Sequence, residues 1–191
     1  MTEVTGLRTG EIMKNRAECI REYGSDYFIR KKLESGELFL IEKGIYNDRS
    51  YVPELALLCY KYPNAVLTMD TAFYVHGLTD EVPAMTDMAT DRDAAKIRDC
   101  RIRQFFEPKS FFRTGITLTG FMGYSLPVYD RERMLIELIR HQGRMSREHY
   151  KELIGVYRKL ITDMDTEKLM LYASMAPKSA SIIRSLDTEV F

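Results

Sequence analysis

The sequence has little of what marks several large classes of protein. It contains no tryptophan, three cysteines and no excess of charge of either sign, with 28 basic and 28 acidic residues among 191. Cys19, Cys59 and Cys100 are far apart and form no CxxC pair, which argues against a disulfide framework and a structural zinc site. No stretch approaches about 18 consecutive apolar residues, and the N-terminus has no apolar signal region. We therefore expect no membrane span and a location in the reducing cytoplasm.

The charge balance sets a condition on any interaction with nucleic acid. Residues 1–50 hold nine Lys/Arg and nine Asp/Glu, so this segment is as neutral as the whole chain. Proteins that bind nucleic acid usually carry a basic excess. Affinity for DNA would therefore have to come from where the charges lie rather than from their number.

Residues 25–47 (SDYFIRKKLESGELFLIEKGIYN) hold the clearest local pattern. Ser25 is a favourable residue to begin a helix, because its hydroxyl can accept a hydrogen bond from a free backbone N–H of the first turn. Ile29 and Leu33 lie four residues apart and would face a core. Gly36 suits the left-handed conformation that ends many helices. The apolar run that follows turns once and returns, so the pattern predicts a helix followed by a two-stranded ribbon.

The residues before this stretch complete a known order of elements. Asn15 can cap a helix over residues 16–23, and Gly24 would end it. Helix, helix, glycine turn, helix and ribbon is the order of a winged helix-turn-helix. The residues expected in its core are Leu7, Ile12, Ile20, Ile29, Leu33, Leu38 and Ile45.

The remainder of the chain predicts a larger α/β domain. The polar turn NDRS at residues 47–50 suggests a boundary between domains at 1–50 and 51–191. Apolar segments predict strands of a mixed sheet at 65–68, 85–90, 101–106, 116–121 and 124–129. Pro127 makes the last of these an edge candidate, because proline cannot donate to a ladder. The segments with helical periodicity are 53–60, 69–76, 131–141, 147–161, 167–175 and 179–186. The predicted fold class is α+β, with a winged helix, a mixed sheet and C-terminal helices.

Three blocks, taken in order, resemble the AbiEi family of bacterial antitoxins and transcriptional regulators from type IV, abortive-infection toxin–antitoxin systems. The first is ESGELFLIEKGIY at 34–46, which resembles the family's wing with its Gly-Ile-Tyr ending. The second, residues 67–78, resembles a family helix that ends in His-Gly-Leu. The third, residues 128–140, starts a helix with Tyr-Asp-Arg-Glu-Arg. The resemblance spans roughly residues 8–145.

The resemblance implies a function as well as a fold. A protein of this family represses its own promoter by binding inverted repeats through the winged helix. Its larger C-terminal domain supplies the antitoxin activity in phage defence. The partner toxin is nucleotidyltransferase-like, and the resemblance implies that the antitoxin acts without contacting it directly. We therefore expect a repressor and antitoxin that is not an enzyme and needs no cofactor or metal.

The candidate DNA-binding residues come from the helix–ribbon stretch and the helix before it. Arginine makes bidentate contacts to guanine, whereas lysine more often positions a protein on phosphates. The free N–H groups at the start of a helix also favour phosphate, and Lys43 lies at the expected wing tip. Asp26 and Glu34 would repel the backbone unless they pair with basic residues at helical spacing. The candidates are Arg16, Ser25, Tyr27, Arg30, Lys31 and Lys43.

Other groups of residues have competing interpretations. Four aspartates could hold metal ions for nucleotidyl transfer, but the Gly-Ser turn that marks such sites is missing. These are Asp70, Asp87, Asp91 and Asp93. His76 at a helix end is typical of a capping or packing histidine, and His141 and His149 have no partners at ligand spacing. The SFFRT segment at 110–114 fits a core pair of phenylalanines better than a stacking surface.

Two alternatives to the repressor therefore remain open. One is a winged-helix protein-interaction module that does not bind DNA, which the neutral N-terminal segment favours. The other is a metal-dependent, nucleotidyltransferase-like enzyme, which requires the four aspartates to converge in a cleft.

Overall fold

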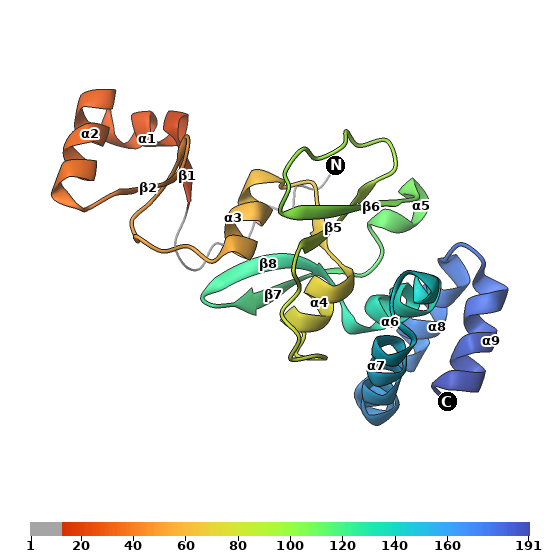
Figure 1. Ribbon diagram of the computed structural model, residues 1–191. Helices are drawn as coiled ribbons and strands as arrows, with labels where there is room; N and C mark the ends of the chain where they lie inside the picture. The colour runs from red at the N-terminus through yellow and green to blue at the C-terminus, as the bar shows by residue number, and fades with distance from the viewer. Residues whose placement is uncertain (1–12) are drawn as a thin grey trace. The chain divides into compact units, whose positions relative to one another are not determined.

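The computed structural model describes residues 13–191, which form two compact units. One unit contains residues 13–63 and the tip of a hairpin, Gly120–Leu126. The other contains Asn64–Thr119 and Pro127–Phe191. Each is described by itself, and Figure 1 shows the order of their elements. Leu7 and Ile12, which the sequence places in the first core, lie outside the described residues.

The first unit consists of short helices and a small antiparallel sheet. Its elements are β1 (Lys14–Asn15), α1 (Arg16–Tyr23), α2 (Asp26–Ser35), β2 (Phe39–Glu42), β3 (Ile45–Asn47) and α3 (Glu54–Lys61). The predicted helix and ribbon of residues 25–47 are confirmed by α2, β2 and β3. The sheet has the order β1–β3–β2, so β1 adds a strand that the sequence did not predict. Cys19, Ile29 and Leu38 form the buried centre of this unit.

Caps and glycine turns define the two helices of this unit. Asn15 accepts a hydrogen bond from the Glu18 N–H at 2.9 Å, and the Glu18 carboxylate accepts one from the Asn15 N–H at 2.7 Å. This reciprocal pair satisfies two backbone donors that the first turn leaves free. Gly36 has φ 74°, the left-handed conformation predicted for it. Ser25 occupies the cap position of α2, but its hydroxyl makes no capping hydrogen bond, contrary to the prediction.

The second unit contains a mixed five-stranded sheet and most of the helices. Its sheet has the order β6–β5–β4–β8–β7, with β4 antiparallel to β5 and parallel to β8, and β5 parallel to β6. The strands are β4 (Val66–Leu67), β5 (Thr86–Asp91), β6 (Ile102–Glu107), β7 (Ile116–Phe121) and β8 (Tyr124–Tyr129). The tip of the β7–β8 hairpin belongs to the first unit. The α+β class with a mixed sheet and C-terminal helices is thus confirmed.

Strand β8 corrects one prediction. Pro127 made β8 an edge candidate, but β8 lies between β4 and β7, and β7 is the edge. The physical reason is the length of β4, which has two residues and pairs with β8 only at Leu67 and Val128. So short a ladder can be formed without an N–H from Pro127.

The second unit also contains helices, some of which begin at a capping side chain. They are α4 (Met69–Val75), α5 (Lys109–Phe112), α6 (Arg131–Arg140), α7 (Arg147–Leu160), α8 (Thr166–Met175) and α9 (Ser179–Glu189), with 3-10 turns η1 (Gln142–Arg144) and η2 (Ile161–Asp163). Asp130, Ser146 and Asp165 each accept a hydrogen bond from a first-turn N–H of α6, α7 and α8 respectively. Helix α6 packs against α8 and α9. None of the described helices is long and apolar enough to cross a membrane.

Gly115 is the glycine on which packing depends most directly. It has φ 77°, and a Cβ at this position would lie 2.6 Å from the Arg133 Cβ and 3.1 Å from Tyr172. We expect Gly115→Ala to lower the free energy of unfolding by roughly 2–5 kcal/mol, combining left-handed backbone strain with overpacking. Urea unfolding followed by circular dichroism measures this loss.

Gly123 provides the matched control for this substitution. It also has a positive φ, 88°, but a Cβ there would meet nothing within 4 Å. Gly123→Ala should therefore lower the free energy of unfolding by only about 1–2 kcal/mol, the strain of the left-handed backbone. Equal losses for the two variants would show that the close approach to Arg133 contributes nothing.

Candidate functional site

The outer face of α2 is the first candidate site. We use this name for Tyr27, Arg30, Lys31 and Glu34, which follow the i, i+3, i+4, i+7 spacing of one helical face. All four are exposed, whereas Ile29 on the opposite face is buried. Tyr27 is 68% exposed and its ring lies edge-on to Phe28, so it does not pack on the ribbon. The predicted outward orientation of these residues is confirmed.

Ion pairs around this face leave several basic side chains free. Asp26 was expected to pair with Arg30 or Lys31 but bonds instead to Arg16, whose Nε lies 3.0 Å from its Oδ1. Arg16, at the start of α1, lies beside the start of α2. Asp26 therefore pairs with Arg16 rather than with a basic residue of its own helix. Other acidic residues of the unit are also paired, in Glu22–Lys14, Glu37–Lys32 and Glu42–Lys61.

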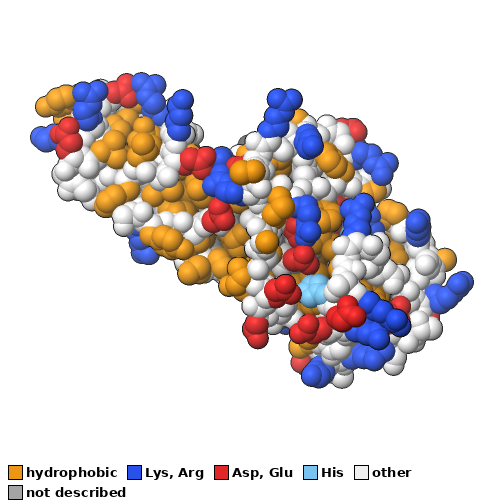
Figure 2. Space-filling model, in the orientation of Figure 1, with side chains coloured by type: hydrophobic (Ala, Val, Ile, Leu, Met, Phe, Trp, Pro, Cys, Tyr) orange, Lys and Arg blue, Asp and Glu red, His pale blue; other side chains and the backbone are white. Residues whose placement is uncertain are grey.

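The outer face of α2 carries two basic residues and one acidic residue, within a segment that is neutral overall. Among residues 13–63, Arg21, Arg30, Lys31 and Lys43 are exposed and have no ion pair with a described residue. Lys43 lies in the turn between β2 and β3, as predicted, where Gly44 has φ 80°. Glu34 is the one acidic residue on the outer face of α2, and no ion pair neutralises it among the described residues. On the visible face of Figure 2, acidic and basic side chains are intermingled, and neither forms a continuous patch.

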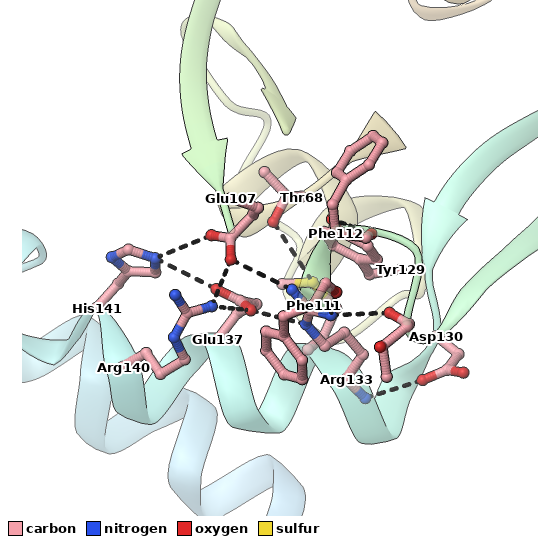
Figure 3. Close-up of polar contacts among 12 residues, drawn as sticks. Thr68, Glu107, Phe111, Phe112, Tyr129, Asp130, Arg133, Glu137, Arg140 and His141 are labelled. Atoms are coloured by element: carbon pink, nitrogen blue, oxygen red, sulfur yellow. Dashed lines mark hydrogen bonds and ion pairs between the residues drawn. The ribbon is translucent and has the colours of Figure 1, made fainter. Parts of the chain in front are cut away.

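A buried ionic cluster in the second unit was missed by the sequence reasoning. Arg133 is fully buried and donates to Glu137 at 2.7 Å, to the Phe111 carbonyl at 2.6 Å and to the Thr114 carbonyl at 2.8 Å. Arg140 donates to both Glu107 and Glu137, at 2.8 and 2.5 Å. Figure 3 shows these side chains converging between α6 and the end of β6.

The electrostatics of this ionic cluster are balanced. Two carboxylates, Glu107 and Glu137, face two guanidinium groups, Arg133 and Arg140. Burial raises the pKa of Glu137, but the contact with His141 and the two guanidinium charges outweigh it and hold that pKa below its usual range. Glu107, Glu137 and His141 offer ligand atoms within 4.8 Å of one another. The arginines already neutralise both carboxylates, so a divalent ion would add uncompensated buried charge.

The four aspartates do not share one site. Asp87 is buried and binds Arg103 through both oxygens, at 2.6 and 2.7 Å, and Asp70 accepts from the same guanidinium at 2.7 Å. Asp91 lies four residues beyond Asp87 on β5, about 13 Å along an extended strand. Asp93 pairs with Lys109 at 2.5 Å. Asp70 and Asp87 thus share Arg103, whereas Asp91 and Asp93 lie elsewhere, so the four aspartates do not converge on one site.

A cavity of about 400 Å³ lies beside the Asp70–Arg103 pair. Its lining includes Asp70, Glu81, Arg103, Arg144, Ser146 and His149. Acidic and basic groups are present in nearly equal number, and Arg103 is already bound by two carboxylates. The cavity thus offers no surplus of charge that selects an anion or a cation.

Two further interpretations of local motifs are confirmed. His76 ends α4, and its Nε2 lies 2.7 Å from the Tyr129 carbonyl, which makes it a packing histidine at a helix end. Burial lowers its pKa. Phe111 and Phe112 are buried, as a core pair should be. The three cysteines are all free, with Cys100 exposed.

Comparison with known proteins bears on the fold alone. No protein-family model matches the sequence, and no curated protein matches it significantly. Among solved structures, the crystal structure of the RV2827C protein from Mycobacterium tuberculosis is similar to this one, with a TM-score of 0.63. The two are 15% identical, and the match covers 93% of this chain and 72% of that chain.

The ionic cluster makes a direct prediction about stability. Arg133→Met would leave two buried carboxylates short of a partner, so we expect a loss of about 3–5 kcal/mol in the free energy of unfolding. Arg131→Met is the matched control, because Arg131 is exposed two residues away, and it should change stability by no more than about 0.5 kcal/mol. Urea unfolding of both variants measures the difference. Similar losses in the two would contradict a structural role for the cluster.

Proposed function

We propose that this chain is a DNA-binding autorepressor and antitoxin of the AbiEi type. In this proposal residues 1–50 form a winged helix, α2 is its recognition helix, and the β2–β3 ribbon is its wing. The observation that carries the proposal is the outer face of α2, on which Arg30 and Lys31 have no ion pair among the described residues. Nearby acidic side chains, Asp26 and Glu37, are bound elsewhere.

The assignment of roles follows from the position of each candidate residue. Arg30 is suited to a guanine edge in the major groove, because its guanidinium can donate two parallel hydrogen bonds. Lys31 and Lys43 would hold phosphates on either side of that contact. Arg16 is held by Asp26 and contributes less, and Ser25 acts through its place at the start of α2. Tyr27 offers an exposed ring to a sugar or a thymine methyl.

The antitoxin half of the proposal rests on how two of the resembling blocks pack. Residues 67–78 form the end of β4 together with α4, and residues 128–140 form the end of β8 together with α6. They meet at the Leu67–Val128 bridge, and His76 donates to the Tyr129 carbonyl. Segments 61 residues apart thus build one core, which supports the resemblance to the family's larger domain.

A protein-interaction module that does not bind DNA is the second candidate. The observation that favours it is Glu34, an exposed acidic residue on the outer face of α2 with no ion pair among the described residues. A mixed face of this kind suits a charged protein surface as well as a phosphate backbone. The enzyme alternative is weaker, because Asp70 and Asp87 are occupied by Arg103.

DNA binding is tested by fluorescence anisotropy with the inverted repeat upstream of the chain's own gene. Arg30→Ala should weaken binding by about 5–150-fold, equivalent to about 1–3 kcal/mol. Lys31→Ala should weaken it for all sequences alike and lower the salt slope by about one. Lys151→Ala, an exposed lysine of α7, is the control that should bind like the wild type.

Two outcomes decide between the candidates. Tight binding to the promoter and weak binding to a scrambled duplex of equal length support the repressor. No binding to either duplex at low salt removes the repressor and leaves the interaction module.

The antitoxin activity is tested separately. If a nucleotidyltransferase-like gene lies immediately downstream, co-expression of this chain should restore the growth that its product arrests. The Arg30→Ala/Lys31→Ala variant should restore growth equally, because we assign neutralisation to the second unit. Continued arrest with the wild-type chain would remove the antitoxin half, whatever the DNA result.

A further inference from the structure

Strand β7 is an uncovered edge of the five-stranded sheet (Figure 1). It pairs with β8 on one side and has no neighbouring strand on the other among residues 13–191. None of its six residues is buried, and Ile116 and Leu118 are 39% and 46% exposed. Such a strand offers free N–H and C=O groups to any other strand, so it needs either protection or a partner.

The hydrogen bonds of the β7–β8 hairpin show which backbone groups of β7 point outward. The Asp130 N–H donates to the Gly115 carbonyl at 2.7 Å, at the open end of the hairpin. Along an antiparallel strand, residues that bond to the neighbour alternate with residues whose groups point away from it. Ile116, Leu118 and Gly120 therefore direct their N–H and C=O groups to the free edge. These three are also the exposed residues of the strand.

The other sheet edges of the described residues have protection that β7 lacks. Strand β6 carries the charged Arg103, and its Gln104 side chain bonds to the loop before it. The register of β2 shifts between Leu40 and Glu42, and β1 has only two residues. Charges, bulges and short strands are the means by which proteins prevent pairing at an edge. Strand β7 has six residues, with no charge and no proline among them.

Charge and symmetry favour a second copy of this chain as the partner of β7. When two identical strands pair antiparallel about a two-fold axis, a residue near the axis meets its own copy. A charged residue there would repel itself, and β7 contains none. With the axis at Leu118, the outward groups of Ile116, Leu118 and Gly120 all meet outward groups of the other copy. Thr117 then lies opposite Thr119 of the second copy, which is a favourable cross-strand pair.

We propose that this chain forms a two-fold symmetric dimer through β7, in which the two five-stranded sheets join as one continuous sheet. Leu118 lies opposite Leu118 of the second copy, and Ile116 lies opposite its Gly120. A Cβ at Gly120 would meet nothing within 4 Å, so this position has room for the isoleucine. Association stops at two chains, because the protected edge at β6 provides no second site for pairing.

The dimer goes beyond the proposed function and does not depend on it. A repressor that binds an inverted repeat needs two recognition helices, and a two-fold dimer has the symmetry of such a repeat. The evidence for the dimer, however, lies in β7 rather than in α2. Association is measured without DNA, so a monomeric chain and a chain that fails to bind DNA are separate results.

Sedimentation equilibrium of the full chain without DNA tests the dimer. Between about 1 μM and about 1 mM, where small interfaces dissociate, the average mass should rise from that of one chain towards twice that mass. Leu118→Lys sets two ammonium groups against each other at the axis and should weaken association by about tenfold or more. Leu171→Lys is the matched control, because Leu171 is 57% exposed on α8, and it should associate like the wild type.

A pair of oppositely charged variants tests the register. Leu118→Glu alone should associate as weakly as Leu118→Lys alone. An equimolar mixture of the two should associate at least as strongly as the wild type, because opposite charges then face each other across the axis. Circular dichroism of each variant establishes that it is folded before the mixture is measured.

Three results would overturn the proposal. The first is a wild-type chain that stays monomeric at every concentration, which would show that β7 does not bind a second copy. The second is wild-type association of Leu118→Lys or Leu118→Glu alone. The third is a mixture of the two folded variants that fails to recover association, since this would contradict the pairing of Leu118 with its own copy.

Discussion

The buried pairing of Arg133 with Glu107 and Glu137 is the constraint on which the second unit depends. Arg133 reaches from α6 to β6, to a carbonyl within α5 and to one just after it, so one guanidinium contacts three elements. A buried charge tolerates little displacement, because separation from its partner leaves it unsolvated. Gly115 must lack a side chain for Arg133 to lie where it does. Through Arg140 and His141 the same ionic cluster extends to the start of the α6–α7 connection.

Much of this fold was predictable because its local signals are strong. Asn15, Asp130 and Ser146 each cap a predicted helix. A short polar side chain just before a segment of helical periodicity is a strong signal, because it can accept a hydrogen bond from a free N–H of the first turn. Partners distant in sequence were not predictable. Arg133 and Glu137 at i, i+4 resemble a surface pair, and nothing local reveals that Glu107 and two carbonyls complete the cluster. The prediction that β8 is an edge strand and the predicted ion-pair partners of Asp26 were wrong for the same reason.

The candidate DNA-binding surface shows how a neutral segment can present positive charge. Composition counts acidic and basic residues equally, but the field at a surface depends on which of them are paired. Lys14, Lys32 and Lys61 each form an ion pair with a carboxylate of the same unit. Arg30, Lys31 and Lys43 are not among them, and they lie on α2 and on the turn of the ribbon. Glu34 lowers the positive potential of this surface. We therefore expect its affinity for DNA to depend on the salt concentration.

The central claim is that α2 and the β2–β3 turn contact DNA. Backbone NMR spectra of the full chain, recorded with and without the promoter duplex, test it most directly because they locate the contact. The account predicts shifts concentrated in residues 26–35 and 42–45, with α7, α8 and α9 unchanged. Shifts confined to the second unit, or none in α2 at saturating duplex and low salt, would contradict it.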